Sequence, residues 1–429
     1  MRDLIHRPES ADEITSAMQR LRALMGDGAL SVDFILDSFE RWSSALDAPE
    51  LRNVAGVTFL RLWLRRNTLE PILTRELGRH YIDDSWQVDG RASLRAFPVG
   101  VVGHWAAGNI DIQPILSMTC ALLGGNSCIV RVPSALREST ELILEKLQEA
   151  DRTGSLSGRV FAMTFDHSRS DLHEAMARGV DGAMVWGGEQ AVSYVRALPF
   201  PHWARVLVFG PRLSVAMMDA AAWREEPIWF QRLARDVWQF EQQACSSPQT
   251  LFIERSEKCE MAELADGLEW AFREENRLHQ RRDIEPAMTS AICQGRASWL
   301  LANEVNGARF PQTPDWTILL GSQVELPTPT QGRTLHVLVV DDLFEPISRF
   351  HGNVQTVGLG ISVPHREQAL AEAAARRGVD RVVKLGQMHV FGSPWDGLDL
   401  VRPMVRLVRH VPSSDSKTER RNGTCAVVS

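Results

Sequence analysis

From about residue 96 onward, short apolar runs alternate with segments of helical periodicity, and this alternation restricts the fold more than any other feature of the chain. Helical stripes, such as the one over residues 136–147, separate the runs. In the first half, strands are predicted at Phe97–Val102, Cys128–Val132, Arg159–Phe165, Ala183–Trp186 and Arg205–Phe209. Strands that alternate with helices form βαβ units, whose parallel sheet is covered on both faces. The sequence therefore predicts an α/β fold, and such sheets bind ligands at the carboxyl ends of their strands.

A second α/β segment begins after about residue 213. An amphipathic helix carries Phe230, Leu233 and Val237, and strands are expected at Leu251–Ile253 and Leu335–Val340. An alanine-rich stretch over 367–377 predicts a helix that ends before a glycine. The second half of the chain therefore repeats the layered architecture of the first.

The two ends of the chain differ from this alternating middle. Ser10 and Ser31 precede helical stripes, which we interpret as structural helices with polar caps. Apolar and charged residues nearly alternate over Met404–Val411, as they do in an edge or exchanged strand. The tail from Ser413 is polar, and we expect it to be disordered.

Composition and charge exclude several classes of protein. The net charge of -7 argues against a general nucleic-acid binder. The six cysteines are sparse, with no CxxC pair and no Cys/His spacing typical of zinc sites, so we expect a reducing, cytoplasmic location and no metal. Residues 112–130 carry no charge, but their polar residues and glycines predict a buried helix and strand rather than a membrane span.

The segment around Cys245 is the most informative about chemistry. It lies between the amphipathic helix and a strand, so Cys245 is expected on a loop among small polar neighbours. A cysteine thiolate there could act as a nucleophile. Most free cysteines are small buried apolar side chains, so position alone does not decide between the two readings.

Two turns between a strand and a helix could bind charged groups. Asn109 could offer its side-chain amide to a developing oxyanion, although an asparagine is also an ordinary turn residue. Gly187 and Gly188 would let a phosphate approach the backbone amides at a helix start. Neither GxGxxG nor GxxxxGK[ST] is present, so the common nucleotide fingerprints do not apply.

Taken together, these segments resemble the acyl-CoA reductase (LuxC) family of the aldehyde dehydrogenase superfamily over about residues 50–410. Residues 243–249 resemble the stretch around the family's acylated cysteine, residues 107–109 its oxyanion asparagine, and residues 381–397 its C-terminal pattern. The resemblance implies N-terminal helices with a Rossmann-type dinucleotide-binding domain over 1–212. It also implies a catalytic α/β domain over 213–397, then an oligomerisation strand and polar tail over 398–429.

The same resemblance assigns residues to a nicotinamide cofactor. Arg131 ends a strand whose last residue, usually lysine, meets the adenosine ribose, and Gly187 and Gly188 match the pyrophosphate turn. Asp342 begins a loose match to the segment whose acidic residue holds the nicotinamide ribose. A guanidinium beside the adenosine ribose can grip a 2′-phosphate, so Arg131 favours NADPH over NADH.

One departure from ordinary aldehyde dehydrogenases favours reduction. Those enzymes have a glutamate that activates the hydrolytic water, and this sequence has Val208 at that position. An acyl group on Cys245 would then survive to meet a hydride or a thiol. The resemblance therefore implies NADPH-dependent reduction of an acyl thioester to the aldehyde. The acyl group would be carried by coenzyme A or a carrier and would be fatty, and Asn109 would hold the oxyanion.

Several alternatives stay open at this point. The chain could be a hydrolytic aldehyde dehydrogenase with another base, or a non-catalytic partner of an acyl-protein synthetase. The group that activates Cys245 is undetermined, and His202 and Glu241 are unranked candidates. The C-terminal strand predicts a homo-oligomer, and an acyl-protein synthetase is an expected partner.

Overall fold

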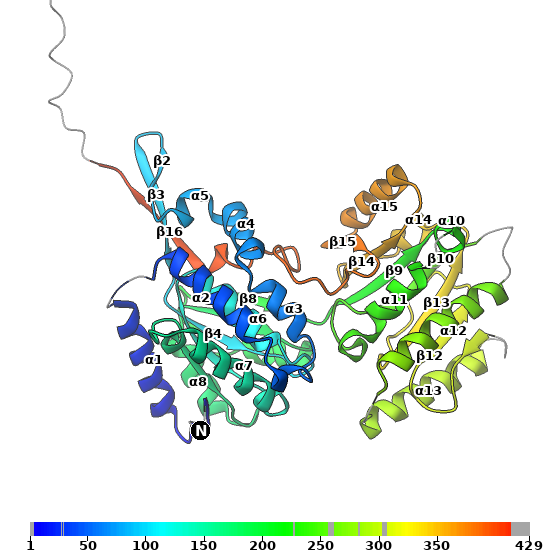
Figure 1. Ribbon diagram of the computed structural model, residues 1–429, viewed down its shortest axis with the longest axis horizontal. Helices are drawn as coiled ribbons and strands as arrows, with labels where there is room; N and C mark the ends of the chain where they lie inside the picture. Colours follow the sequence, from blue (N-terminus) through cyan, green and yellow to red (C-terminus); the bar gives the residue numbers. More distant parts are fainter. Residues whose placement is uncertain are drawn as a thin grey trace, which may run out of the picture.

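The computed structural model describes residues 4–26, 28, 30–225, 228–255, 261–281, 284–302 and 307–412. These residues form two α/β lobes, each built around its own sheet, with a small third sheet beside the first lobe (Figure 1). The polar tail from Ser413, which we expected to be disordered, lies outside the described residues.

The first lobe holds a parallel sheet of six strands in the order β1-β6-β5-β4-β7-β8. The strands are β1 (Ile5–His6), β4 (Val101–Trp105), β5 (Ser127–Arg131), β6 (Val160–Met163), β7 (Gly182–Trp186) and β8 (Arg205–Phe209). The chain passes from β4 through β5 to β6 on one side, then returns to the other side of β4 with β7. The strand order therefore reverses between β4 and β7, the place where open α/β sheets bind their ligands.

Helices cover both faces of this sheet, as the sequence pattern predicted. One face carries α1 (Ala11–Gly26), α8 (Ser170–Gly179) and α9 (Glu189–Arg196), and the other carries α2 (Val32–Ala45), α6 (Gln113–Leu123) and α7 (Arg137–Ala150). The uncharged stretch near residue 112 forms α6, which is buried along its whole length. No helix among the described residues is long and apolar enough to cross a membrane.

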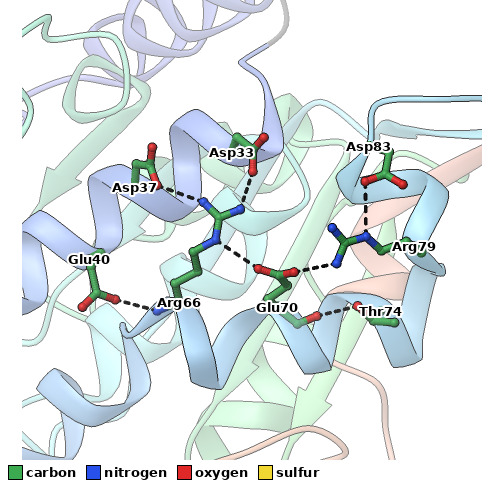
Figure 2. A network of polar contacts seen from close by, with 8 residues as sticks. All are labelled: Asp33, Asp37, Glu40, Arg66, Glu70, Thr74, Arg79 and Asp83. Carbon is green, nitrogen blue, oxygen red and sulfur yellow. Dashed lines mark hydrogen bonds and ion pairs between the residues drawn. The ribbon is translucent and has the colours of Figure 1, made fainter.

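The N-terminal helices are held together on their outer side by a cluster of ion pairs centred on Arg66 (Figure 2). Arg66 begins α4 (Arg66–Leu77), and its guanidinium pairs with Asp33 and Asp37 of α2 and with Glu70 one turn further along α4. Glu70 in turn accepts from Arg79 at 2.7 Å. This network docks α4 against α2, and it supports the interpretation of these helices as structural.

The second lobe holds seven strands in the order β11-β12-β13-β10-β9-β14-β15, parallel except for β11. They are β9 (Leu213–Met218), β10 (Pro248–Glu254), β11 (Ala308–Arg309), β12 (Thr317–Gly321), β13 (Thr334–Val340), β14 (Val354–Gly360) and β15 (Arg381–Lys384). One face packs against α11 (Ile228–Trp238) and α12 (Met261–Leu278), and the other against α14 (Phe344–Ser348) and α15 (Pro364–Arg376).

The third sheet has the order β16-β3-β2 and joins the C-terminal strand to the first lobe. It consists of β2 (Gln87–Asp89), β3 (Ala92–Pro98) and β16 (Val405–His410). β16 pairs antiparallel with β3 and lies at the edge of the sheet, where Leu407 is exposed. The C-terminal segment is therefore an edge strand, and its role in a homo-oligomer stays a prediction.

The single strand predicted over Phe97–Val102 is wrong. The structure divides this run between the end of β3 and the start of β4, which belong to different sheets. The division falls at Val99 and Gly100, and Gly100 has a φ of 143°. The apolar run in the sequence does not show this break, because both strands are largely apolar where they meet.

Candidate active site

The carboxyl edge of the first sheet faces the amino edge of the second across a cavity of about 620 Å³. The loops after β4, β7 and β8 line one side of the cavity, and the loop before β10 lines the other. The sequence-predicted residues among its lining are Asn109, Arg131, Gly187, Gly188 and Cys245. Segments far apart in the chain therefore meet at one site, and Asp342 is the one predicted site residue outside it.

The loop that carries Cys245 is shaped by an unusual backbone. After α11, Phe240, Glu241 and Gln242 have φ angles of 54°, 54° and 61°. Left-handed conformations cost energy for residues other than glycine and persist where the surrounding structure enforces them, often at functional sites. These residues end the helix and turn the chain, so Cys245 does not lie at a helix C-terminus in line with α11. The unfavourable effect that the dipole of α11 would have on a Cys245 thiolate is thereby reduced.

Two buried glutamine side chains fix the cysteine loop to the second sheet. The Gln242 amide donates to the carbonyls of Pro248 and Thr334, both at 2.8 Å, and its oxygen accepts from the Thr334 N–H at 2.7 Å. Gln249 donates to the carbonyl of Gln242 at 3.1 Å. The Cys245 carbonyl accepts from the Ser214 hydroxyl at 2.7 Å. This network explains why the loop needs polar residues of these types.

Cys245 is half-buried, and burial is the main cause that raises the pKa of its thiol to about 11. The carboxyl of Asp396 raises the pKa further, whereas the Gln355 side chain, the Arg381 charge and the Ser246 N–H lower it. The resting thiol therefore keeps its proton at neutral pH. Chemistry at this sulfur requires that the bound substrate or a neighbouring group favour the thiolate.

Asn109 lies in the loop after β4 and reaches across the cavity. Its side-chain amide donates to the carbonyl of Gln243 at 2.8 Å. Gln243 lies two residues before Cys245, so the amide is held beside the cysteine loop. This position fits a donor to an oxygen that develops charge on a carbonyl bound to Cys245.

Gly187 and Gly188 connect β7 to α9 at the point where the strand order reverses. A Cβ atom added at Gly188 would meet nothing within 4 Å, so the backbone at the start of α9 faces open space. Arg131 ends β5, and its guanidinium donates to the Phe165 carbonyl at 3.4 Å. Arg131 also lines a second cavity of about 750 Å³, together with Arg7 and Arg137. These residues fit a dinucleotide whose phosphate lies at α9 and whose ribose lies near Arg131.

The structure does not bring Asp342 to this cavity. Asp342 is exposed, follows the carboxyl end of β13, and caps the Phe344 N–H at 3.0 Å. β13 runs parallel to β10, whose amino end follows Cys245, so the length of a strand, roughly 20 Å, separates the two positions. The short local match in sequence did not indicate at which end of the strand the segment lies. Pro329 and Gln331 line the cavity from the amino side of β13 instead.

The two candidate bases from the sequence also lie away from the sulfur. His202 precedes β8, so it is at the amino edge of the first sheet, and it is exposed. Glu241 forms ion pairs with Arg281 at 2.6 Å and Arg333 at 2.5 Å. Neither residue lines the cavity, so neither has the placement of a base for Cys245.

A histidine that sequence reasoning left unassigned does line the cavity. His389 Nε2 lies 2.7 Å from the backbone carbonyl of Asp236, and its Nδ1 lies 3.0 Å from the Ser246 hydroxyl. Since a carbonyl only accepts, Nε2 carries the proton, and Nδ1 accepts from Ser246. Burial lowers the pKa of His389 to about 4, so the ring is neutral at pH 7. Both nitrogens are therefore already occupied in this arrangement.

The remaining cavity wall is largely apolar. Phe391 stacks edge-on with Trp63 at 4.8 Å and lies 4.9 Å from Trp395, measured between ring centroids. The large apolar side chains of the lining are Phe59, Ile110, Ile112, Leu116, Trp186, Phe209, Leu213, Phe240, Phe391 and Trp395. No aspartate or glutamate is among the described residues that line the cavity. Within the described part of the chain, no group of three or more His, Cys, Asp or Glu side chains could hold a metal ion.

Comparison with protein families gives a match to the acyl-CoA reductase (LuxC) model over residues 30–410. The long-chain acyl-protein thioester reductase of Vibrio harveyi is 25% identical over 371 residues, which cover 85% of this chain and 74% of that protein. The protein of the same description from Aliivibrio fischeri is 24% identical over 357 residues, which cover 80% of this chain and 71% of that protein.

Solved structures of low sequence identity share the fold. An aldehyde dehydrogenase from Brucella melitensis biovar abortus has a TM-score of 0.70 at 12% identity, covering 94% of this chain and 89% of that one. The betaine aldehyde dehydrogenase of Staphylococcus aureus has a TM-score of 0.68 at 11% identity, covering 97% and 92%. The predicted aldehyde dehydrogenase-like α/β fold is thereby confirmed.

Proposed function

The chain belongs to the acyl-CoA reductase (LuxC) family, and we propose that it reduces an acyl thioester to the aldehyde with NADPH, through an acyl intermediate on Cys245. The observation that carries this proposal is the composition of the cavity. Cys245 and Asn109 line it together with Gly187 and Gly188, and no carboxylate is among its described lining residues. The cavity therefore contains a nucleophile and an oxyanion donor, and its described lining residues include no carboxylate that could act as a base toward water.

The reaction begins with attack of the Cys245 sulfur, as thiolate, on the carbonyl carbon of the bound thioester. The oxyanion is stabilised by the Asn109 amide, and the thiolate of the carrier leaves as the acyl group passes to Cys245. One thioester replaces another, so the barrier depends mainly on position and charge. A reduced nicotinamide, when bound, supplies the hydride that takes the acyl group to the aldehyde level.

The lining of the cavity supports reduction rather than hydrolysis. Val208 packs into the apolar core on the α8 and α9 side of the first sheet and is not among the cavity lining residues. His389 could act as a base only after giving up its hydrogen bond from Ser246. Water in the cavity therefore lacks an available base, and the acyl group on Cys245 persists until hydride or a thiol reaches it.

The preference for NADPH rests on the arginines near β5. Arg131, Arg7 and Arg137 line one cavity beside the carboxyl end of this strand. A guanidinium binds a phosphate with paired hydrogen bonds, and three of them around one cavity favour a dianionic 2′-phosphate over a hydroxyl. Glu138 and Glu141 line the same cavity, so part of this positive charge is balanced.

The apolar wall supports a fatty acyl chain as the substrate. Phe59 and Phe240 lie with ring centroids 6.2 Å apart, and Phe391 continues the aromatic surface toward Trp395. Each methylene buried against such a wall contributes about 0.8 kcal/mol to binding. The relatives described as long-chain acyl-protein thioester reductases agree with this substrate class.

The experiment that tests the proposal is incubation of the protein with hexadecanoyl-CoA and NADPH, followed by trapping of the product as a hydrazone for mass spectrometry. We expect hexadecanal and loss of NADPH absorbance in equal amounts. Release of free hexadecanoic acid without NADPH consumption would support a hydrolytic enzyme instead. No turnover with coenzyme A or carrier-bound acyl groups would favour a non-catalytic partner of an acyl-protein synthetase.

A further inference from the structure

The short helix α3 (Val57–Trp63) of the N-terminal region forms part of the wall of the active-site cavity. It lies on the side of the first lobe that faces the second lobe (Figure 1). Its Phe59 lines the cavity, and its Trp63 packs edge-on against Phe391, another lining residue, with 4.8 Å between ring centroids. A helix far from Cys245 in the sequence therefore borders the space in which the proposed substrate binds.

The lining of the cavity comprises two sets of residues with different chemistry. The first set, with Arg131 and the glycines of the β7–α9 turn, suits the dinucleotide. The second set is apolar, packs against the same core as Cys245, and consists of Phe59, Ile112, Leu116, Phe240 and Phe391. An acyl chain attached to Cys245 would therefore lie against this second set, which we call the acyl wall.

Gly56, directly before α3, lies behind the acyl wall. Its φ angle is 85°, in the left-handed region that favours glycine. A Cβ atom there would lie 2.8 Å from Cε1 of Phe240 and 2.9 Å from Cδ1 of Ile112, well inside van der Waals contact. Both side chains line the cavity, whereas Gly56 is not among the lining residues. The missing side chain of Gly56 therefore gives Phe240 and Ile112 room on the side away from the cavity.

The helix α3 is fixed at both of its ends. The Ala55 N–H, next to Gly56, donates to the Asp111 carboxylate in the loop after β4 at 3.1 Å. At the other end, the Trp63 Nε1–H donates to the Thr119 hydroxyl of α6 at 3.0 Å, in a buried contact. These bonds hold α3 against the first lobe, so it forms a wall of fixed position rather than one that yields to a longer chain.

Phe59 is the side chain of α3 that reaches the cavity itself. It is half-buried, and its ring centroid lies 6.2 Å from that of Phe240. Phe240 in turn has a left-handed backbone, with a φ of 54°, and packs edge-on against His389 at 5.4 Å. The Phe59 ring therefore fills space beside a neighbour that is held in place, and its removal would leave this space open.

We propose that Gly56 and Phe59 set the length of the acyl chain that the cavity accepts, with opposite effects. The missing side chain of Gly56 keeps Phe240 and Ile112 clear of the cavity, whereas the Phe59 ring occupies part of it. This inference rests on the proposed function, in which the chain is attached to Cys245, but its test does not require turnover.

The test uses iodoacetamide and a series of N-alkyl iodoacetamides, from N-butyl to N-octadecyl, as probes. They alkylate Cys245 and place their chain where an acyl chain would lie, and peptide mass spectrometry confirms the modified residue. The ratio of each N-alkyl rate to the iodoacetamide rate removes differences in thiol reactivity between variants. Each buried methylene should raise this ratio about fourfold, until the chain fills the cavity. The longest chain that still raises the ratio is the quantity compared.

The two variants should move this limit in opposite directions. Gly56→Ala should lower the rate ratio at the limiting chain length of the wild type about fourfold or more, because the added Cβ pushes Phe240 and Ile112 toward the cavity. Phe59→Ala should raise the ratio for the next longer chain about fourfold, because the space of the ring becomes available to another methylene.

Two control variants separate these effects from general damage to the fold. Gly154→Ala repeats the backbone strain without the contact, because Gly154 has a φ of 70° and an added Cβ would meet nothing within 4 Å. Leu62→Ala removes a side chain from the outer side of α3, where Leu62 is 54% exposed. Both controls should keep the limiting chain length of the wild type.

Thermal unfolding shows whether each variant is folded. If Gly56→Ala does not fold, Phe59→Trp replaces it and should also shorten the limit, because the larger ring takes up more of the cavity. A limit that is unchanged in either test variant, or that moves in the same direction in both, would overturn the proposal, as would a wild-type rate ratio that does not depend on chain length.

The outcome also distinguishes this inference from the proposed function. If the limits move as expected but no acyl thioester yields an aldehyde with NADPH, the proposed function fails while this inference stands. If aldehyde is formed but the limiting chain length is the same in all variants, this inference fails while the proposed function stands.

Discussion

The side-chain amide of Asn109 donates a 2.8 Å hydrogen bond to the backbone carbonyl of Gln243, two residues before Cys245. The bond joins the carboxyl edge of the first sheet to the cysteine loop of the second lobe. To stabilise an oxyanion on an acyl group at Cys245, the amide must exchange the Gln243 carbonyl for the substrate oxygen. A neutral hydrogen bond contributes about 1 kcal/mol, and an oxyanion donor about 3 kcal/mol. The exchange is therefore favourable in the transition state.

This relationship predicts the effect of Asn109→Ala. The rate of acyl transfer to Cys245 and the rate of reduction should fall about a hundredfold, because the oxyanion loses a donor. Single-turnover acylation measures the first rate, and aldehyde formation the second. Asn67→Ala, at an exposed position on α4, is the matched control and should retain full activity. Full activity in Asn109→Ala would leave Asn109 as a turn residue.

Arg131 is predicted to set the choice of cofactor. The wild type should have a higher kcat/KM with NADPH than with NADH, and Arg131→Ala should reduce or reverse that ratio. The reason is the loss of a guanidinium from the cavity that it shares with Arg7 and Arg137. Arg152→Ala, on an exposed loop, should leave the ratio unchanged. A wild type that prefers NADH would show that these arginines serve another purpose.

The acyl group on Cys245 should be long-lived in the absence of NADPH. No aspartate or glutamate is among the described residues that line the cavity, and the nitrogens of His389 are occupied by Ser246 and the Asp236 carbonyl. Free coenzyme A should discharge the acyl group, because a thiol is a far better nucleophile than water. The measurement follows a labelled acyl group with and without coenzyme A. Rapid spontaneous release as the free acid would identify a hydrolytic enzyme.

The buried histidines predict that the protein loses stability in mild acid. Burial lowers the pKa of His104 to about 3 and of His173, His336 and His389 to about 4. Between pH 6.5 and 4 the unfolded chain therefore binds protons that the folded chain does not, so stability falls as the pH falls. Each histidine contributes up to about 1.4 kcal/mol per pH unit. Asp236 opposes this trend, because burial raises its pKa to about 7.

The thermal unfolding midpoint at pH 7 and pH 5 measures this effect. His104→Asn should make the midpoint less sensitive to pH, because one buried neutral imidazole is removed. His167→Asn is the control, since the His167 side chain is 89% exposed. A midpoint that does not fall between pH 7 and pH 5 would contradict the assignment of these histidines as neutral.

The fold could be predicted from the sequence where a single helix or strand has its own clear pattern of apolar residues. The helical stripe over 136–147 became α7, and the predicted strand Arg205–Phe209 is β8. β14 could not be predicted in the same way, because it is buried on both faces and its sequence contains glycines that break the pattern. The break between β3 and β4 was missed for a related reason. A continuous apolar run shows no alternation of apolar and polar residues, so it does not indicate where one strand ends and the next begins.

The site was predictable where a short motif lies on one loop. Cys245, Asn109 and Gly187 each follow or precede a strand, and the parallel topology brings these loops together. His389 was not found, because its place beside the cysteine loop arises from tertiary packing over more than a hundred residues of chain.

The location of the acyl group tests the central claim most directly. The protein is incubated with hexadecanoyl-CoA in the absence of NADPH, and the modified peptide is identified by mass spectrometry. The account predicts one acyl group per chain, on Cys245. Cys245→Ala should carry none, and Cys293→Ala, which removes an exposed cysteine on α13 (Pro286–Ala302), should be acylated like the wild type. An acyl group on another residue, or one that persists in Cys245→Ala, would contradict the account.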